Sequence, residues 1–80
     1  MFYVYVLKSI SFPDQMYVGF TNNVEQRLTD HNAGNSPHTK KYRPWTLEFY
    51  ACFKSEKTAF EFEKYLKSCS GRAFMLKRLL

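Results

Sequence analysis

The sequence predicts a small α+β protein whose elements follow one another in the order ββαβαα. Three observations favour this fold. The chain has 80 residues, enough for one hydrophobic core but not two, so residues 1–80 are expected to form a single domain. Its composition is 45% hydrophobic and 19% aromatic, with only three glycines and three prolines, which excludes disordered and low-complexity proteins. Segments rich in β-branched and aromatic residues alternate with segments of helical periodicity.

The chain begins with a predicted β-hairpin. Phe2–Leu7 is apolar on both alternating faces, which is typical of a strand covered on both sides. Ser9–Gln15 contains proline and aspartate and is expected to be a loop. Met16–Thr21 is then the second strand, antiparallel to the first.

The hairpin is followed by the signals of a helix. Asn22 or Asn23 can cap its first turn, because asparagine side chains accept hydrogen bonds from free backbone N–H groups. The helix is expected to run from Val24 to about Asn32 and to end at Gly34.

The second half contains a loop, a strand and two helices. Asn35–Pro44 has two prolines, three basic residues and no apolar period, so an exposed basic loop is expected before a strand over Trp45–Phe53. Ser55 can cap a helix that Gly71 is expected to break, with a short basic helix over Ala73–Leu80 after it. The apolar stripe of the longer helix has spacings of three, four and three residues and consists of Ala59, Phe62, Leu66 and Cys69.

The compartment is predicted from the opening segment and the cysteines. The apolar run Met1–Leu7 lacks a basic leader and is far shorter than the roughly 20 residues that span a bilayer, so neither a signal peptide nor a membrane helix is expected. Cys52 and Cys69 are too few and too far apart for a zinc cluster. We therefore expect a cytoplasmic protein in which both thiols are reduced packing residues.

Positive charge is concentrated at the end of the chain. Twelve basic and seven acidic residues give a net charge of +5. Up to Glu63 the two signs balance, and the whole excess lies in Lys64, Lys67, Arg72, Lys77 and Arg78. A surface of one sign attracts polyanions, which favours a nucleic-acid partner, although a solvated basic helix face would give the same pattern.

Two polar residues share the apolar side of the first predicted helix. His31 lies on one stripe with Val24 and Leu28, and Arg27 lies at the edge of that stripe, one turn before His31. Both side chains are therefore expected to face the sheet. A functional pair is one interpretation; a hydrogen-bonded core histidine beside an arginine that extends to solvent is the other.

Glu63 raises the same question on the longer second helix. It lies one turn from both Ala59 and Leu66, so its carboxylate is expected at the margin of the buried stripe. A partly buried carboxylate needs a cation nearby. That cation is either Arg27, in a structural pair, or a hard divalent metal ion.

Two tyrosines of the hairpin are separated by twelve positions. If the register places Tyr5 opposite Tyr17, their side chains share one face of the sheet. Gly19, two residues further on, would let another group approach the backbone there. The alternative is an ordinary pair of core tyrosines.

These residues together resemble the GIY-YIG nuclease family, in particular its small single-domain members. The resemblance covers essentially the whole chain. It implies a three-stranded antiparallel sheet flanked by helices, a site on one face of the sheet, and hydrolysis of a DNA phosphodiester with one divalent ion. The motif residues are Tyr3-Val4-Tyr5, Tyr17-Val18-Gly19, Arg27, His31 and Glu63.

The resemblance also implies a role for each site residue. Glu63 would hold one Mg²⁺ or Mn²⁺ ion. Tyr5 and Tyr17 would position or deprotonate the attacking water. Arg27 would stabilise the charged phosphoryl oxygens, since its guanidinium offers a planar fork of donors. His31 would assist proton transfer.

The sequence departs from the family pattern at two points. Tyr3-Val4 stands where the family name has Gly-Ile, a change expected to alter the strand more than the chemistry. Residues 64–80 contain no Asn, which family members with a complete site carry downstream of the Glu, and this absence leaves the activity open. The leading hypothesis is a metal-dependent DNA endonuclease or nickase of low sequence specificity, acting on branched, flap or single-stranded DNA. The alternative is a nucleic-acid-binding module that keeps the fold but has lost turnover.

Five basic residues are the candidate DNA contacts. They include no obvious base-reading element, so binding is expected to depend on phosphates. They are Lys40, Lys41, Arg43, Lys67 and Arg72.

Overall fold

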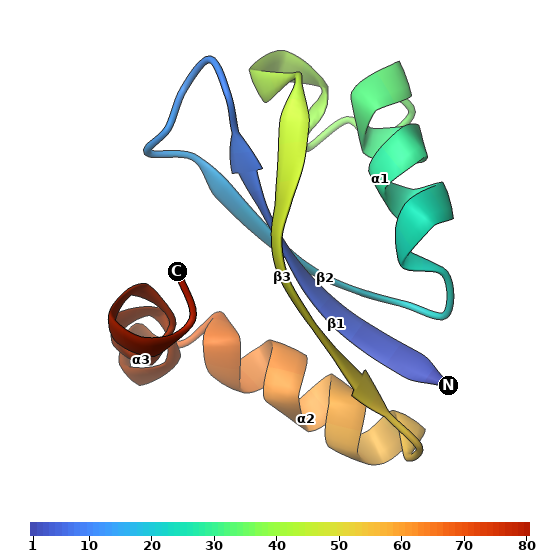
Figure 1. The fold of residues 1–80 in the computed structure, drawn as a ribbon, viewed down its shortest axis with the longest axis vertical. Helices are drawn as coiled ribbons and strands as arrows, with labels where there is room; N and C mark the ends of the chain where they lie inside the picture. The colour runs from blue at the N-terminus through green and yellow to red at the C-terminus, as the bar shows by residue number, and fades with distance from the viewer.

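A computed structural model of the chain describes residues 1–80 (Figure 1). Its elements are β1 (Phe2–Ser9), β2 (Met16–Thr21), α1 (Val24–Ala33), η1 (Lys40–Tyr42), β3 (Trp45–Phe53), α2 (Glu56–Leu66) and α3 (Cys69–Arg78). The order ββαβαα is confirmed, and the single addition is the short 3-10 helix η1.

The three strands form one antiparallel sheet in the order β2-β1-β3. The α+β class and the three-stranded antiparallel sheet are therefore confirmed. The central strand β1 is covered on both faces, so Val4, Val6 and Leu7 have no exposed surface. This arrangement explains why the strand reads as a continuous apolar run.

The two faces of the sheet carry separate layers of side chains, because successive residues of a strand point to opposite sides. Figure 1 shows α1 on one side of the sheet and α2 with α3 on the other. The buried residues on the side of α2 and α3 are Val4, Val6, Val18, Ala59, Leu66 and Met75. Those on the side of α1 are Tyr5, Leu7 and Trp45, against which Tyr17, Val24 and Leu28 pack.

The boundaries of α1 follow from its capping residues. Asn23, and not Asn22, is the N-cap, and its side chain accepts a hydrogen bond from the Gln26 backbone N–H at 3.1 Å. Gly34 ends the helix with φ 83°, the left-handed conformation that a residue without Cβ adopts without strain.

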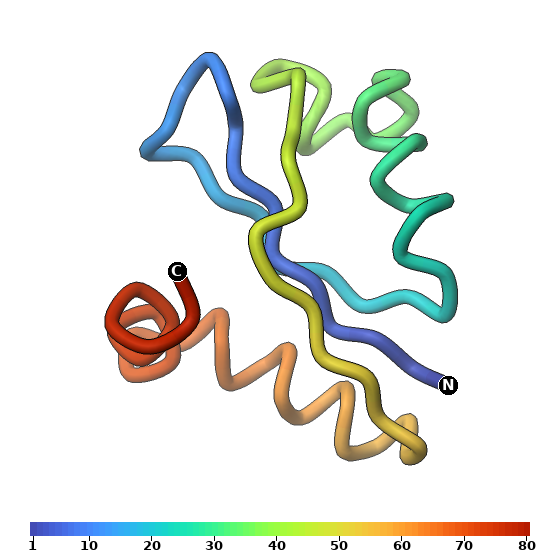
Figure 2. Tube along the Cα trace, in the orientation of Figure 1, coloured from blue at the N-terminus to red at the C-terminus, as the bar shows by residue number.

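The segment that follows α1 returns to the end of the sheet where the β1–β2 connection lies (Figure 2). Two hydrogen bonds join these segments: the Ile10 N–H donates to the Pro44 carbonyl at 3.0 Å, and the Ser9 hydroxyl donates to the Tyr42 carbonyl at 2.7 Å. The path of this segment is therefore fixed by contacts distant in sequence.

The expected exposed loop over Asn35–Pro44 is only partly correct. Its basic residues are exposed, but Thr39 is buried with 1% of its surface accessible. The Thr39 side chain contacts His31, and its carbonyl accepts a hydrogen bond from the Trp45 indole at 2.9 Å. A polar, proline-containing segment has no periodic pattern that would single out one buried side chain.

The predicted break at Gly71 is wrong. The helix α2 ends at Leu66, Ser68 caps α3, and Gly71 lies inside the first turn of α3, where its N–H donates to the Ser68 hydroxyl. A Cβ on Gly71 would overlap the Tyr65 carbonyl oxygen, so glycine is needed for close packing of the two helices. The expected last helix accordingly starts earlier than residue 73.

The expectation that both cysteines are packing residues is also wrong. Cys52 and Cys69 are free, but both are exposed. Cys69 leaves the apolar stripe of the longer helix because α2 ends before it and α3 starts in a new direction. None of the helices combines the length and the apolar character that crossing a membrane requires.

Candidate active site

Tyr5 occupies the centre of the candidate site. Its position in β1 is opposite Gly19 in β2, and not opposite Tyr17 as considered from the sequence. Tyr17 pairs with Leu7 and lies diagonally from Tyr5 on the same face, with the two ring centroids 6.2 Å apart. A Cβ on Gly19 would overlap the Tyr5 ring. The group that approaches the Gly19 backbone is therefore Tyr5 itself.

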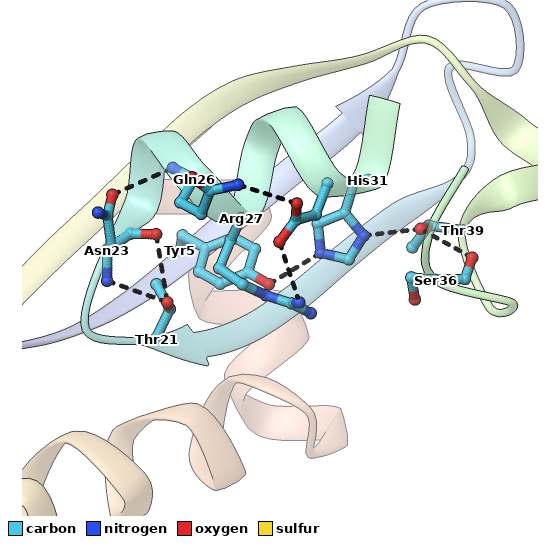
Figure 3. A network of polar contacts seen from close by, with 9 residues as sticks. Tyr5, Thr21, Asn23, Gln26, Arg27, His31, Ser36 and Thr39 are labelled. Atoms are coloured by element: carbon cyan, nitrogen blue, oxygen red, sulfur yellow. Dashed lines mark hydrogen bonds and ion pairs between the residues drawn. The ribbon is translucent and has the colours of Figure 1, made fainter. Parts of the chain in front are cut away.

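His31 comes to the same point from α1. Its imidazole has no exposed surface and lies between two hydroxyl groups (Figure 3). The Nε2 atom is 2.9 Å from the Tyr5 hydroxyl, and the Nδ1 atom is 2.6 Å from the Thr39 hydroxyl. The ring centroid of Tyr17 lies 4.8 Å from that of His31. His31 therefore faces the sheet, as its helical stripe predicts.

Burial keeps His31 neutral. The pKa of His31 is lowered, first because burial disfavours the charged imidazolium and second because of the positive charge of Arg27, while Asp30 opposes the shift. Near neutral pH one ring nitrogen of His31 is therefore free to accept a hydrogen bond or a proton.

Burial also keeps the Tyr5 phenol protonated. It raises the pKa of Tyr5, and the charges of Tyr17 and Glu63 act in the same direction, while hydrogen bonding and charge from Arg27 oppose them. Tyr5 can act as a base only when a further cation or a proton acceptor assists it.

Arg27 lies at the open side of the Tyr5 hydroxyl. Figure 3 shows its side chain running beside the Tyr5 ring, on the same side of α1 as His31. The pKa of Arg27 is raised, chiefly by hydrogen bonding to Tyr5. Its side chain is 37% exposed, and its carboxylate neighbour is Asp30 at 3.8 Å. The guanidinium thus lies beside Tyr5 and Asp30 and remains accessible to an anion.

Glu63 has a different partner from the one considered as the structural alternative. Its carboxylate is 3.0 Å from the Lys67 ammonium, one turn further along the chain, and forms no ion pair with Arg27. The Glu63 side chain is only 15% exposed. The structural interpretation that pairs Glu63 with Arg27 is therefore wrong.

The donor atoms present fit a divalent ion held mainly by water and substrate. No group of three or more His, Cys, Asp or Glu residues is arranged to bind a metal. Glu63 is the carboxylate that the family resemblance implies as the ligand, and a second carboxylate, that of Asp30, lies 3.8 Å from Arg27. Mg²⁺ keeps several waters and is commonly bound through one or two carboxylates together with substrate phosphates. The site suits that kind of coordination and does not suit a cage made by the protein alone.

The candidate DNA contacts lie in two exposed groups. Lys40, Lys41 and Arg43 belong to η1 and the residue after it, directly beyond the buried Thr39. Lys67 and Arg72 line a hollow of about 190 Å³ that Tyr17 also lines. The second group is therefore continuous with the tyrosine side of the site.

Thr39 is the site residue that sequence reasoning missed. It contacts His31 across the end of α1, eight positions along the chain. No helical or strand period relates the two residues, because the helix ends at Gly34 and Thr39 lies in a separate turn. The only local signal is a small hydroxyl residue beside the basic run, which is too common to predict burial.

Comparison with known proteins identifies a family model and relatives that are similar to this chain. The family model described as "GIY-YIG catalytic domain" matches residues 1–77. A UPF0213 protein of Bacillus licheniformis is 36% identical over 71 residues, which cover 88% of this chain and 71% of that protein. A UPF0213 protein of Staphylococcus haemolyticus is 38% identical over 69 residues, which cover 85% and 82%.

A longer relative and a solved structure extend the comparison. A "structure-specific endonuclease subunit SLX1 homolog" of Giardia intestinalis is 37% identical over 65 residues, which cover 76% of this chain but 18% of that protein. The solution NMR structure of a UPF0213 protein from Bacillus halodurans aligns with a TM-score of 0.57 and 26% identity. The alignment covers 96% of this chain and 84% of that one, so the two folds correspond along their length.

Proposed function

The chain belongs to the GIY-YIG family, and from that premise we propose that it is a metal-dependent DNA endonuclease or nickase of low sequence specificity. One observation carries the proposal. The Tyr5 hydroxyl is hydrogen-bonded to a buried, neutral His31 at 2.9 Å and lies beside an accessible Arg27 guanidinium. A proton acceptor and an anion-binding group thus meet on one face of the sheet.

Arg27 would bind the phosphate that is cleaved. Its planar fork can contact two phosphoryl oxygens, and it already lies beside the Tyr5 ring and 3.8 Å from Asp30. A donor that is oriented before the reaction stabilises charge that develops in the transition state without further reorganisation.

Tyr5 and His31 would accept the proton of the attacking water. The phenol would take the proton, and its own proton would pass to the ring of His31. Tyr17, on the same face and 4.8 Å from the imidazole by ring centroids, would position the water. The raised pKa of Tyr5 makes this relay necessary, because the phenol alone is a poor base.

Glu63 would hold one Mg²⁺ or Mn²⁺ ion, with Lys67 displaced from the carboxylate. When bound, such an ion polarises the phosphoryl oxygens as a Lewis acid and lowers the pKa of a coordinated water. The protein would supply one negatively charged ligand and the shape of the site around it.

The basic residues would bind the DNA backbone without reading its sequence. They are exposed, they lie in α3 and in or directly after η1 and α2, and phosphate contacts carry no sequence information. A relative is named a structure-specific endonuclease subunit, so branched, flap or single-stranded DNA in the cytoplasm, and a role in DNA repair, are the first possibilities to test.

A nucleic-acid-binding module without turnover is the second candidate. Two observations favour it: Lys67 already neutralises the Glu63 carboxylate, and no Asn follows Glu63 to support the site.

A cleavage assay separates the two candidates. Supercoiled plasmid, flap DNA and single-stranded DNA are incubated with the protein in Mg²⁺, in Mn²⁺ and in a chelator. Tyr5→Phe removes the central hydroxyl and keeps the ring, and Tyr65→Phe is the matched control at an exposed tyrosine of α2. The proposal expects metal-dependent cutting that Tyr5→Phe abolishes and Tyr65→Phe preserves. Binding without cutting in every condition supports the module instead.

A further inference from the structure

Thr39 belongs to a segment that was expected to be exposed, but its hydroxyl is buried in the site. Thr39 lies between His31 and Trp45, with its Oγ1 atom 2.6 Å from the Nδ1 atom of His31. The Trp45 indole donates to the Thr39 carbonyl at 2.9 Å and so holds the residue against the end of α1. A hydroxyl can donate to or accept from an imidazole nitrogen. The direction of this short contact therefore follows from counting the donors and acceptors between Tyr5 and Ser36.

The donors and acceptors around the Tyr5 hydroxyl decide whether Nε2 of His31 carries a proton. The Tyr5 side chain is 1% exposed, so its single proton needs an acceptor within the protein. Arg27, whose side chain lies beside Tyr5 (Figure 3), can only donate. If His31 Nε2 also donated to Tyr5, the phenol proton would have no acceptor. The Tyr5 hydroxyl therefore donates to Nε2, and Nε2 carries no proton.

The donors and acceptors around the Thr39 hydroxyl fit the same protonation of His31. With Nε2 unprotonated, the proton of the neutral ring is on Nδ1, and it must be donated to the Thr39 oxygen. The Thr39 proton then points to the Ser36 carbonyl, 3.5 Å away, which also accepts from the backbone N–H groups of Thr39 and Lys40. Every buried polar side-chain atom has a partner in this arrangement.

We propose that Thr39 is a positioning residue that holds His31 in its Nδ1–H tautomer, so that Nε2 faces the Tyr5 hydroxyl as an acceptor. Thr39 touches neither the DNA nor the attacking water and acts only through His31. The tautomer is assigned to His31 in the protein without substrate. Its use in catalysis rests on the proposed nuclease function.

In that reaction the proton movements balance. A water O–H bond breaks as the Tyr5 oxygen takes that proton, and the original Tyr5 O–H bond breaks as a new N–H bond forms at Nε2. The water oxygen forms the new P–O bond, and the leaving oxygen takes the electron pair of the broken P–O bond and a proton from solvent. His31, now an imidazolium, keeps its Nδ1–H bond to Thr39 and later returns the other proton to solvent.

Nitrogen NMR of the two histidine side chains tests the tautomer directly. His31 is distinguished from the exposed His38 by the variant His38→Gln. The wild-type protein is expected to show Nδ1 protonated and Nε2 unprotonated at His31 at neutral pH. A proton on Nε2 in the wild type would overturn the proposal, whatever the activity of the protein.

Variants at residue 39 test whether the Thr39 hydroxyl determines the tautomer of His31. Thr39→Val keeps the shape and removes the hydroxyl, so at His31 the population protonated on Nε2 is expected to rise. Thr39→Ser keeps the hydroxyl and is expected to retain the wild-type tautomer. Should Thr39→Val fail to fold, Thr39→Ala removes the same hydroxyl without placing a methyl group against Nδ1. An unchanged tautomer in a folded variant without the hydroxyl would contradict the assigned role.

A kinetic measurement separates this inference from the proposed function. Thr39→Val is expected to lower kcat roughly tenfold or more with little change in KM, and Thr39→Ser to restore it, since loss of an orienting partner typically costs factors of about 10 to 100. An equal loss of kcat in both variants would contradict positioning through the hydroxyl. Absence of cleavage by the wild type would remove the nuclease function, while the NMR result would still decide the tautomer.

Discussion

The ring of Tyr5 on β1 lies so close to the Gly19 backbone on β2 that a single methyl group at position 19 would overlap it. The second tyrosine motif ends in glycine for this reason: the glycine makes room for the tyrosine of the first motif. The ring can then lie over Gly19 and direct its hydroxyl at His31.

Gly19→Ala is therefore expected to destabilise the protein and displace the Tyr5 hydroxyl. Overpacking of this kind costs about 1–3 kcal/mol in the free energy of unfolding. Chemical denaturation measures the loss. In a Tyr5→Leu background, where the ring is absent, the same glycine substitution is expected to cost much less, and an equal cost in both backgrounds would show that the ring is not what position 19 accommodates.

The buried His31 predicts a fall in stability on mild acidification. Its pKa in the folded protein is lowered from 6.5, so between that value and the folded pKa the unfolded chain binds more protons. The contribution of neutral His31 is thus complete above 6.5 and is lost as the pH falls, by at most about 1.4 kcal/mol per pH unit. Melting temperatures between about pH 5 and pH 7 measure it. His31→Asn should remove this part of the pH dependence, and His38→Gln should not.

Glu63→Gln is expected to abolish metal-dependent cleavage and leave DNA binding nearly unchanged. The substitution keeps the size of the side chain and removes the charge that a divalent ion needs. Mg²⁺ should raise the melting temperature of the wild type but not of the variant. Glu61→Gln, at an exposed position of the same helix, is the matched control. An equal response of wild type and Glu63→Gln to Mg²⁺ would exclude Glu63 as the ligand.

Arg27→Lys is expected to lower the single-turnover cleavage rate by a factor of about 100 or more. Lysine keeps the charge but lacks the planar fork, and loss of one preorganised donor typically has an effect of this size. DNA binding should barely change. Arg78→Lys, at an exposed position of α3, is the control for the charge-preserving exchange. A folded Arg27→Lys protein that cuts at the wild-type rate would remove Arg27 from the catalytic set.

DNA affinity is expected to fall steeply with salt and to vary little with sequence. Phosphate contacts release counterions, so several of them together weaken binding by orders of magnitude between about 50 and 200 mM salt. Arg72→Ala should reduce the slope of log Kd against log salt by about 1, since it lines the hollow beside Tyr17. Arg78→Ala, further along the same helix, should leave the slope nearly unchanged. Equal affinities at both salt concentrations would contradict phosphate-dominated binding.

Local signals in the sequence predicted the elements and the orientation of the first helix. The helix α1 begins after its capping residue Asn23 and ends at Gly34, where the sequence predicts its ends, because capping depends on residues within one turn. His31 is buried as its helical stripe predicts, because the period of the helix fixes which side faces the sheet. The break assigned to Gly71 failed, because its small size serves packing against Tyr65 in another helix.

The sequence by itself determined the family, the order of the elements and the candidate site residues other than Thr39, since these follow from short-range periods, caps and motif spacing. Only the tertiary structure decided how those residues meet. It placed Tyr5 opposite Gly19 instead of Tyr17, gave Glu63 the partner Lys67 instead of Arg27, and buried Thr39 against His31. Strand register and the partners of buried polar groups depend on contacts between separate elements, and a register changed by one residue would turn every side chain of β2 to the other face.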